Sequence, residues 1–400
     1  MNNSESSIQD ALISIVIPVY NNERYLSTAI ESVLKQPVKK SDDIEVVVVD
    51  DGSTDNTPMV ADSYASNYAH VRVVHQVNQW IYASMNRGID EAKGEYIYIL
   101  NSDDALVDGV LSKMIDKIEE YNHPDVIWTR IAQCEVDDEQ NIISIEENNV
   151  SVNQEKYFDG SEKIHNMWFF IQKSGLAHNQ ANLYKRELMV KHPFRNDIYG
   201  ADVLFNLSIA DEIKSMLFFP DIAYRFYSYN NDAMNASVGK YYDYEHEMFN
   251  EIMRVSSEIY KRWHVNNKEW FDFLVSERLK ELTREIRALK YVNCSLSLHD
   301  KVKKIFTEYA DPWIRKSARK VGREREYESR VLNGTRELLR DTEEVLDTDM
   351  SFVKLLVESL PDNYSDDVEK LNVDMELIDM AVQHNLNKDK IGIVYYHSKW

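Results

Sequence analysis

Short apolar runs alternate with longer amphipathic stretches over the first hundred residues. Nearly continuous runs of this length are typical of strands that are buried on both faces of a parallel sheet, and we expect strands at 13–18, 44–49, 71–74 and 96–100. After the first run, Asn22 is the expected N-cap of a helix in which apolar residues recur at helical spacing. Alternating strands and helices predict an α/β fold, with a mainly parallel sheet flanked by helices.

The pattern changes after residue 240. A chain of 400 residues has room for roughly two to three domains, and we expect a first domain over 1–240 and a mostly α-helical C-terminal domain over 241–400. Spacings of four and three residues there predict the packed face of one long helix, formed by Val275, Leu279, Leu282, Ile286 and Leu289.

Composition narrows the class of protein. Lys and Arg number 46 against 68 Asp and Glu, so the formal charge of −22 argues against a nucleic-acid partner. None of the 11 glycines is spaced for a dinucleotide-binding turn or a phosphate loop.

The two cysteines fit a reducing compartment. The N-terminus does not resemble a secretory signal, and we see no apolar run long enough to span a membrane. A cytoplasmic location is therefore expected.

Charge is unevenly distributed along the C-terminal region. Residues 301–340 hold twelve Lys and Arg against six Asp and Glu, a net charge of +6, whereas 341–400 carry −9. This contrast fits solvated helix faces, contact between the two segments, or contact with a partner such as a second copy of the chain. The stretch from Trp313 to Arg325 also suits docking on a membrane surface, which would place the protein at the inner face of the membrane.

Polar residues gather where the predicted strands end. They occupy 18–23 after the first strand, 50–55 after the second and 101–104 after the fourth. In an open α/β sheet, ligands bind beyond the carboxyl ends of the strands. Asp, Asn, Ser and Gly also dominate ordinary turns, but three such clusters on separate strands favour a binding site.

These clusters carry a family resemblance. Ile15-Val16-Ile17-Pro18, Val49-Asp50-Asp51-Gly52-Ser53, Asn86-Arg87-Gly88-Ile89 and Gly94-Glu95-Tyr96-Ile97 up to Asp103-Asp104 follow one another in the order found in family 2 glycosyltransferases. The chain resembles that family over about residues 12–235. The resemblance implies a GT-A fold and an inverting enzyme that uses a nucleotide-sugar.

The resemblance also implies a nucleotide site. Asp51 would accept hydrogen bonds from the nucleobase, while Pro18 and Tyr20 would shape the base and ribose pocket. Arg87 would offset the diphosphate charge, or it is an ordinary solvated helix arginine. The remaining nucleotide-binding candidates are Glu23, Asn101 and Ser102.

Asn101-Ser102-Asp103 stands where the family carries its D-x-D metal motif. Asp103 is the expected ligand of a divalent cation, Mn²⁺ or Mg²⁺, because carboxylate oxygen suits hard cations. Asn101 departs from the motif and adds no charge. Asp104 is an accessory candidate, or it only caps a turn.

The family's catalytic base lies in a Glu-Asp pair, which here reads Ala201-Asp202. Asp202 is the candidate base, or it only caps the following helix.

Tyr227 replaces a histidine that relatives often carry near the diphosphate, and Arg225 beside it is a further candidate. Packing alone would also explain Tyr227. His178 would line the acceptor cleft, although a lone histidine is more often structural.

We therefore expect transfer of a sugar from a UDP-sugar to a glycan or a lipid-linked glycan in cell-surface polysaccharide synthesis, with a divalent cation. The helical region would bind the acceptor, oligomerise or dock on the membrane. Asn101, Ala201 and Tyr227 motivate an alternative, a nucleotide-sugar or glycan-binding protein with impaired catalysis. A third interpretation makes the helical half an assembly scaffold.

Overall fold

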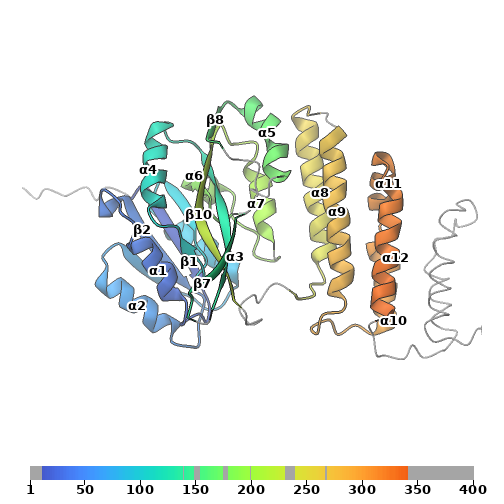
Figure 1. The fold of residues 1–400 in the computed structure, drawn as a ribbon, viewed down its shortest axis with the longest axis horizontal. Coiled ribbons are helices and arrows are strands. Elements are labelled where there is room, and N and C mark those ends of the chain that lie inside the picture. The colour runs from blue at the N-terminus through green and yellow to red at the C-terminus, as the bar shows by residue number, and fades with distance from the viewer. Residues whose placement is uncertain are drawn as a thin grey trace, which may run out of the picture. The chain divides into compact units, whose positions relative to one another are not determined.

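The computed structural model describes residues 11–137, 139–147, 154–173, 179–198, 200–229, 239–265 and 268–340. The chain divides into two compact units, residues 1–235 and 236–400. Each unit has its own architecture: a sheet with helices in the first and helices alone in the described part of the second (Figure 1).

The first half of the sheet in unit one is parallel. Its order is β3-β2-β1-β4, with bounds β1 Ile13–Val19, β2 Ile44–Asp50, β3 Val71–His75 and β4 Tyr96–Ile99. The four predicted strands are thus confirmed to within one residue at each end. β1 and β2 are buried throughout, whereas β3 forms the sheet edge and is partly exposed along most of its length.

The second half makes the sheet mixed. β6 and β10 run parallel to each other, and β9 joins β4 to β6 by antiparallel pairing. β5 and β8 pair antiparallel with β10, and β7 pairs antiparallel with β6. The bounds are β5 Ala105–Leu106, β6 Val126–Val136, β7 Ile142–Glu147, β8 Lys156–Asp159, β9 Leu183–Lys185 and β10 Ser215–Tyr229.

Helices lie on both sides of this sheet (Figure 1). Their bounds are α1 Leu26–Leu34, α2 Thr57–Asn67, α3 Ile81–Glu91, α4 Val110–Glu120, α5 Ser161–Lys173, α6 Arg186–Lys191 and α7 Ala201–Ile209, with a 3₁₀ turn η1 at Ser41–Asp43. The predicted N-cap of α1 is wrong, since α1 begins after Tyr25. Asn22 instead accepts backbone hydrogen bonds from Tyr25 and Leu26 at 3.2 and 3.1 Å, so a turn precedes the helix.

Unit two consists of helices over its described residues. These are α8 Glu245–Arg262, α9 Lys268–Ala288, α10 Leu298–Lys304, the π-helical turn η2 Ile305–Tyr309, α11 Pro312–Val321 and α12 Glu324–Arg340. The predicted apolar face lies on α9 and just beyond its end, where Val275, Leu279, Leu282, Ile286 and Leu289 are all buried. None of the described helices combines the length and apolar character needed to cross a bilayer.

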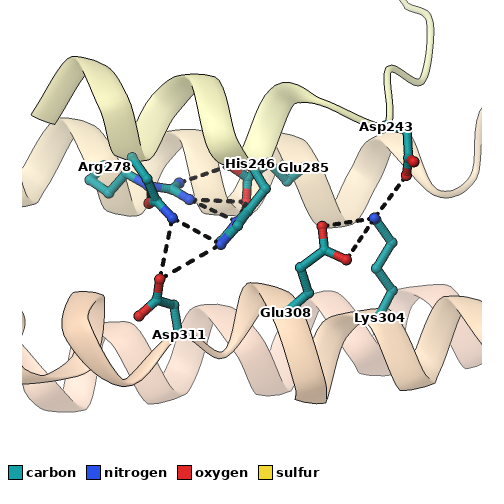
Figure 2. Close-up of polar contacts among 8 residues, drawn as sticks. Asp243, His246, Arg278, Glu285, Lys304, Glu308 and Asp311 are labelled. Atoms are coloured by element: carbon teal, nitrogen blue, oxygen red, sulfur yellow. Dashed lines mark hydrogen bonds and ion pairs between the residues drawn. The ribbon is translucent and has the colours of Figure 1, made fainter. Parts of the chain in front are cut away.

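Charged side chains are buried between the helices of unit two (Figure 2). On α8 and α9, His246 Nδ1 lies 3.1 Å from Glu285 Oε2, and Arg278 Nη1 lies 2.9 Å from Glu285 Oε1. Asp311, the N-cap of α11, has Oδ2 at 3.9 Å from His246 Nε2. These residues, which we call the His246 cluster, link three helical segments.

The two arginines of α11 pair with carboxylates of the same unit. Arg315 contacts Glu324 and Glu328 at 3.0 and 2.8 Å, and Arg319 contacts Glu324 at 2.6 Å. Ion pairs of this kind favour the interpretation of solvated, internally paired helix faces. The acidic stretch 341–400 lies outside the described residues, so its contact with 301–340 stays a prediction, as does membrane docking.

Candidate active site at the strand ends

The loops that follow β1 and β2 are joined by short hydrogen bonds. The Asn21 amide donates to Ser53 Oγ at 2.9 Å, and Asn21 Oδ1 accepts from the Thr54 amide at 2.7 Å. Asn21 has a φ of +48°, a left-handed conformation that asparagine tolerates well. Glu23 Oε2 accepts from the Asn56 amide at 2.7 Å. Glu23, predicted to bind nucleotide, therefore holds the two loops together.

Asp51 organises the next loop. Its Oδ1 accepts from Gln76 Nε2 at 2.7 Å and from the Gln79 amide at 2.9 Å, and its Oδ2 accepts from the Trp80 amide at 2.8 Å. A carboxylate offers about four acceptor positions, so one remains for a ligand. Gly52 has a φ of +73°, and a Cβ there would lie 2.8 Å from the Asn78 nitrogen, so the close approach of this loop requires glycine.

The other nucleotide candidates differ in exposure. Pro18 is buried in β1 opposite Val49, and Tyr20 is 50% exposed just beyond that strand. Arg87 projects from α3 toward Glu91 at 2.8 Å with its side chain half exposed, the geometry of an ordinary helix ion pair. Its role with nucleotide stays a prediction.

Ser102 joins two strand ends. Its Oγ accepts from Asn22 Nδ2 at 2.8 Å, and both residues are buried. The Asn22 amide also donates to Thr57 Oγ1 at 2.8 Å at the start of α2. The ends of β1 and β4 are therefore fixed against each other at the point where the predicted site residues gather.

Asp104 is the centre of a buried hydrogen-bond network. Its Oδ2 accepts from the Tyr224 hydroxyl at 2.5 Å and from Asn101 Nδ2 at 3.0 Å, and its Oδ1 accepts from the Tyr227 amide at 2.8 Å. The antiparallel pairing of β5 with β10 brings these groups together. Burial, and next the charge of Asp103, raise the pKa of Asp104. Asp104 therefore fixes the 101–104 turn rather than simply capping it.

Asn101 and Asp103 carry the other side-chain oxygens of this turn. Asn101 Oδ1 is buried without a hydrogen bond, and the Asp103 carboxylate, whose pKa is raised by burial, is hydrogen-bonded by its own backbone. An amide oxygen beside a carboxylate suits a hard divalent cation. No group of three or more His, Cys, Asp or Glu among the described residues could hold a metal ion. The oxygens of Asn101 and Asp103 therefore suit a hard cation, but the described residues do not supply a full set of protein ligands.

Asp202 lies in the first turn of α7. The N-cap of that helix is Gly200, with a φ of +86°, so Asp202 is not the capping residue. The Gly200 amide donates to the Tyr82 hydroxyl at 3.0 Å, which ties the start of α7 to α3. Burial raises the pKa of Asp202 to about 6. A carboxylate with this pKa is ionised at neutral pH and can accept a proton.

Comparison with known proteins identifies one domain. Residues 14–188, less than half of the chain, match the model of glycosyl transferase family 2. These residues form a family 2 glycosyltransferase domain. The chain is 40% identical to the glycosyltransferase GlyG of Streptococcus pneumoniae over 117 residues. This match covers 29% of the chain and 38% of GlyG. It is 32% identical over 118 residues to the minor teichoic acid biosynthesis protein GgaA of Bacillus subtilis, which covers 29% of this chain and 26% of GgaA. The matches thus span well under half of these relatives.

Solved structures agree on the fold. S. aureus TarS 1–349 is 17% identical, covers 84% of this chain and 94% of its own, and has a TM-score of 0.52. The complex of the same protein with UDP is 16% identical, covers 82% and 89%, and has a TM-score of 0.50. At these identities the likeness concerns the fold alone. The resemblance to family 2 and the predicted α/β fold are confirmed.

Asn86 on α3 was not among the predicted site residues, but it holds the segment that precedes α7. Asn86 Nδ2 donates to the Phe194 carbonyl at 2.8 Å, and the Phe194 amide donates to Asn86 Oδ1 at 2.9 Å. The Phe194 ring also packs on Phe205 of α7, with centroids 4.5 Å apart. Asn86 stands in the motif that marks the family, but nothing local in the sequence indicates a partner 108 residues away.

The departures from the family motifs have structural surroundings of their own. Tyr227 is buried in a small cluster with Tyr25, Cys134 and Tyr229, as the packing interpretation expects. Arg225 lies 3.8 Å from Asp108, on the strand that carries Tyr227. Ala201, in place of the family's glutamate, is buried in α7, and His178 lies outside the described residues.

Proposed function

We propose that this chain is an inverting glycosyltransferase that transfers a sugar from a UDP-sugar to a glycan or a lipid-linked glycan. The family 2 domain supports the reaction class. TarS, which shares the fold, binds UDP, and GgaA, a partial relative, is named for teichoic acid biosynthesis. Synthesis of a polysaccharide or a teichoic acid-like polymer is therefore the proposed setting.

The oxygen Oδ1 of Asn101, buried without a hydrogen bond, carries this proposal. Asp103, with Asn101 in the same turn, would hold Mn²⁺ or Mg²⁺. Such a cation, when bound, stabilises the negative charge that develops on a departing diphosphate. A metal-assisted site also suits a chain that has a net charge of −22 and no glycine-rich phosphate loop.

The remaining residues would bind the nucleotide. Asp51 has one acceptor position left for the N–H of a nucleobase, and Tyr20 and Pro18 lie at the end of the neighbouring strand. Arg87 would approach the diphosphate by exchanging its contact with Glu91, which costs little because that ion pair is exposed. Glu23, Ser102 and Arg225 would keep the surrounding loops in place.

Asp202 would act as the general base. The proton of the acceptor hydroxyl passes to its carboxylate while the acceptor oxygen bonds to the anomeric carbon. The bond between that carbon and the diphosphate oxygen breaks on the opposite face, and its electron pair leaves with UDP. One displacement of this kind inverts the anomeric configuration. His178, before the buried Asn179, would contact the acceptor.

One observation favours the alternative of a binding protein with impaired catalysis. The Tyr227 ring packs in the cluster with Tyr25, Cys134 and Tyr229, and the Tyr227 amide, rather than its hydroxyl, hydrogen-bonds to Asp104. For the helical unit we propose acceptor binding or self-association, with membrane docking as a third role. Arg315 and Arg319 of the 313–325 stretch are paired with Glu324 of the same unit, which does not favour a membrane over the other two roles.

The test is UDP release from a panel of UDP-sugars by the purified chain with Mn²⁺, together with calorimetry of UDP binding. We expect release that depends on metal and acceptor, and loss of transfer with retained UDP binding in Asp202→Asn. Asp197→Asn, an exposed carboxylate paired with Arg195, is the matched control and keeps full activity. UDP binding without turnover on any acceptor favours the binding protein. Absence of UDP binding overturns both.

A further inference from the structure

The main chain of Asp103 is held by a tyrosine from the far end of β10. The Tyr229 hydroxyl donates to the Asp103 carbonyl at 2.8 Å. Tyr229 is only 8% exposed, and its ring packs on Tyr25, with centroids 4.4 Å apart. Because the ring is confined, the hydroxyl acts as a fixed point for the residue that carries the proposed metal ligand.

The same hydroxyl is itself held from another direction. Gln140 Nε2 donates to it at 3.0 Å, and Gln140 Oε1 accepts a hydrogen bond from Thr28 Oγ1 on α1. Gln140 therefore links helix α1 to the turn that connects β6 with β7.

The backbone of this turn fixes Gln140. Its φ is +64°, and its amide donates to the Asp137 carbonyl at 3.0 Å. The Asn141 amide donates to Asp137 Oδ1 at 2.8 Å, which closes the turn. These hydrogen bonds hold the backbone around Gln140, whose side-chain amide reaches the Tyr229 hydroxyl.

We propose that Tyr229 and Gln140 are positioning residues that set the place of Asp103 for the metal and diphosphate. This inference rests on the proposed function, since it assigns them a role in that site. Gln140 holds the Tyr229 hydroxyl, and this hydroxyl in turn holds the main chain of Asp103. Neither residue touches the reacting atoms. Partners that orient a metal ligand typically change metal affinity by about 10- to 100-fold when removed.

Tyr229→Phe removes the hydroxyl and keeps the ring. We expect UDP affinity measured by calorimetry with Mn²⁺ to fall about tenfold, and affinity without metal to change little. The Mn²⁺ concentration that gives half-maximal activity should rise by a similar factor. This change should be larger than the change in kcat.

Tyr96→Phe is the matched control. Tyr96 is also buried, and its hydroxyl donates to a backbone carbonyl, that of Pro124, at 2.7 Å. It lies at the start of β4, at the opposite end of the strand from the 101–104 turn. We expect it to lower stability as Tyr229→Phe does and to leave Mn²⁺-dependent UDP binding unchanged. An equal loss of UDP affinity in both variants would assign the effect to stability alone and overturn the inference.

Gln140→Met tests the order of action. Methionine keeps the length of the side chain and loses both hydrogen bonds. We expect a smaller loss of Mn²⁺-dependent UDP affinity than in Tyr229→Phe, and no further loss in the double variant, because both changes act through one hydroxyl. Additive losses overturn the proposed order. If wild type and Tyr229→Phe bind UDP equally tightly with Mn²⁺, only this inference is overturned. If the wild-type protein shows no metal-dependent UDP binding, both the proposed function and this inference are overturned.

Discussion

Asn101 donates from Nδ2 to Oδ2 of Asp104 at 3.0 Å, and this hydrogen bond fixes which end of the Asn101 amide remains free. With the nitrogen engaged, Oδ1 is buried and has no partner. An aspartate at this position would present a second acceptor to Asp104. The asparagine therefore satisfies Asp104 and leaves a neutral oxygen buried in the same turn as Asp103.

The first prediction concerns Asn101→Asp. Without metal, this variant should unfold at a lower temperature than wild type, since an unsatisfied buried polar group costs about 1–3 kcal/mol. Mn²⁺ should raise its melting temperature more than it raises that of wild type, because added charge strengthens cation binding. Thermal unfolding with and without Mn²⁺ measures both effects. Asn67→Asp, an exposed position on α2, is the control for added charge. Equal melting temperatures for Asn101→Asp and wild type without metal would contradict the prediction.

The second prediction concerns Asp202 and pH. Burial raises its pKa to about 6, so the ionised, proton-accepting form declines below that pH. We expect kcat/KM to fall about tenfold for each pH unit well below the pKa. Asp202→Asn should reduce kcat by about 10²- to 10⁴-fold. A rate profile from pH 4.5 to 8 checks the midpoint, with UDP affinity measured in parallel to separate binding from proton transfer. A kcat/KM that stays constant from pH 7 down to pH 5 would show that Asp202 is not the titrating base.

The third prediction concerns Gly88, where α3 meets β1. A Cβ at Gly88 would lie 2.3 Å from Val16 Cγ1 and 3.2 Å from Val49 Cγ2. Gly88→Ala should therefore destabilise the fold by about 1–3 kcal/mol, the usual cost of overpacking. Adding Val16→Ala removes the clashing methyl and should recover part of that loss. Urea unfolding of the two single variants and the double variant measures the coupling. Strictly additive losses would indicate that the two positions do not meet.

The parallel half of the sheet could be predicted because its signal is local. Each of β1, β2 and β4 is a nearly continuous apolar run followed by polar residues, and the strand bounds agree to within one residue. The family motif then indicated which strand ends carry the site. The edge position of β3 could not be predicted in this way, because it depends on which strand lacks a neighbour rather than on its own sequence.

The contacts that hold the site are not local. β9 has only three residues and pairs antiparallel between β4 and β6, so periodicity cannot reveal it. Asn86, Tyr229 and Gln140 act through hydrogen bonds to segments far away in the chain. The predicted N-cap Asn22 failed for the same reason, since its side chain is used by Ser102, 80 residues away.

The last prediction concerns pH and the His246 cluster in unit two. Burial opposes the charge on His246, but hydrogen bonds with Asp311 and Glu285 outweigh burial and raise the pKa of His246. A raised pKa in the folded state gives stability that is fully present below the unfolded value, about 6.5, and is lost as pH rises through the folded value. Glu245 on α8 acts in the same direction, because burial raises its pKa to about 7.

Hydrogen exchange in α8 and α9 should therefore be slower at pH 6 than at pH 8 after correction for intrinsic exchange rates. His246→Gln should lose the part of this pH dependence that lies above about pH 6.5, since glutamine does not titrate. His75→Gln is the control, because His75 is also a histidine with a raised pKa paired to aspartates but belongs to unit one. Protection of α8 and α9 that stays constant between pH 6 and 8 in wild type would contradict a charged His246 in this cluster.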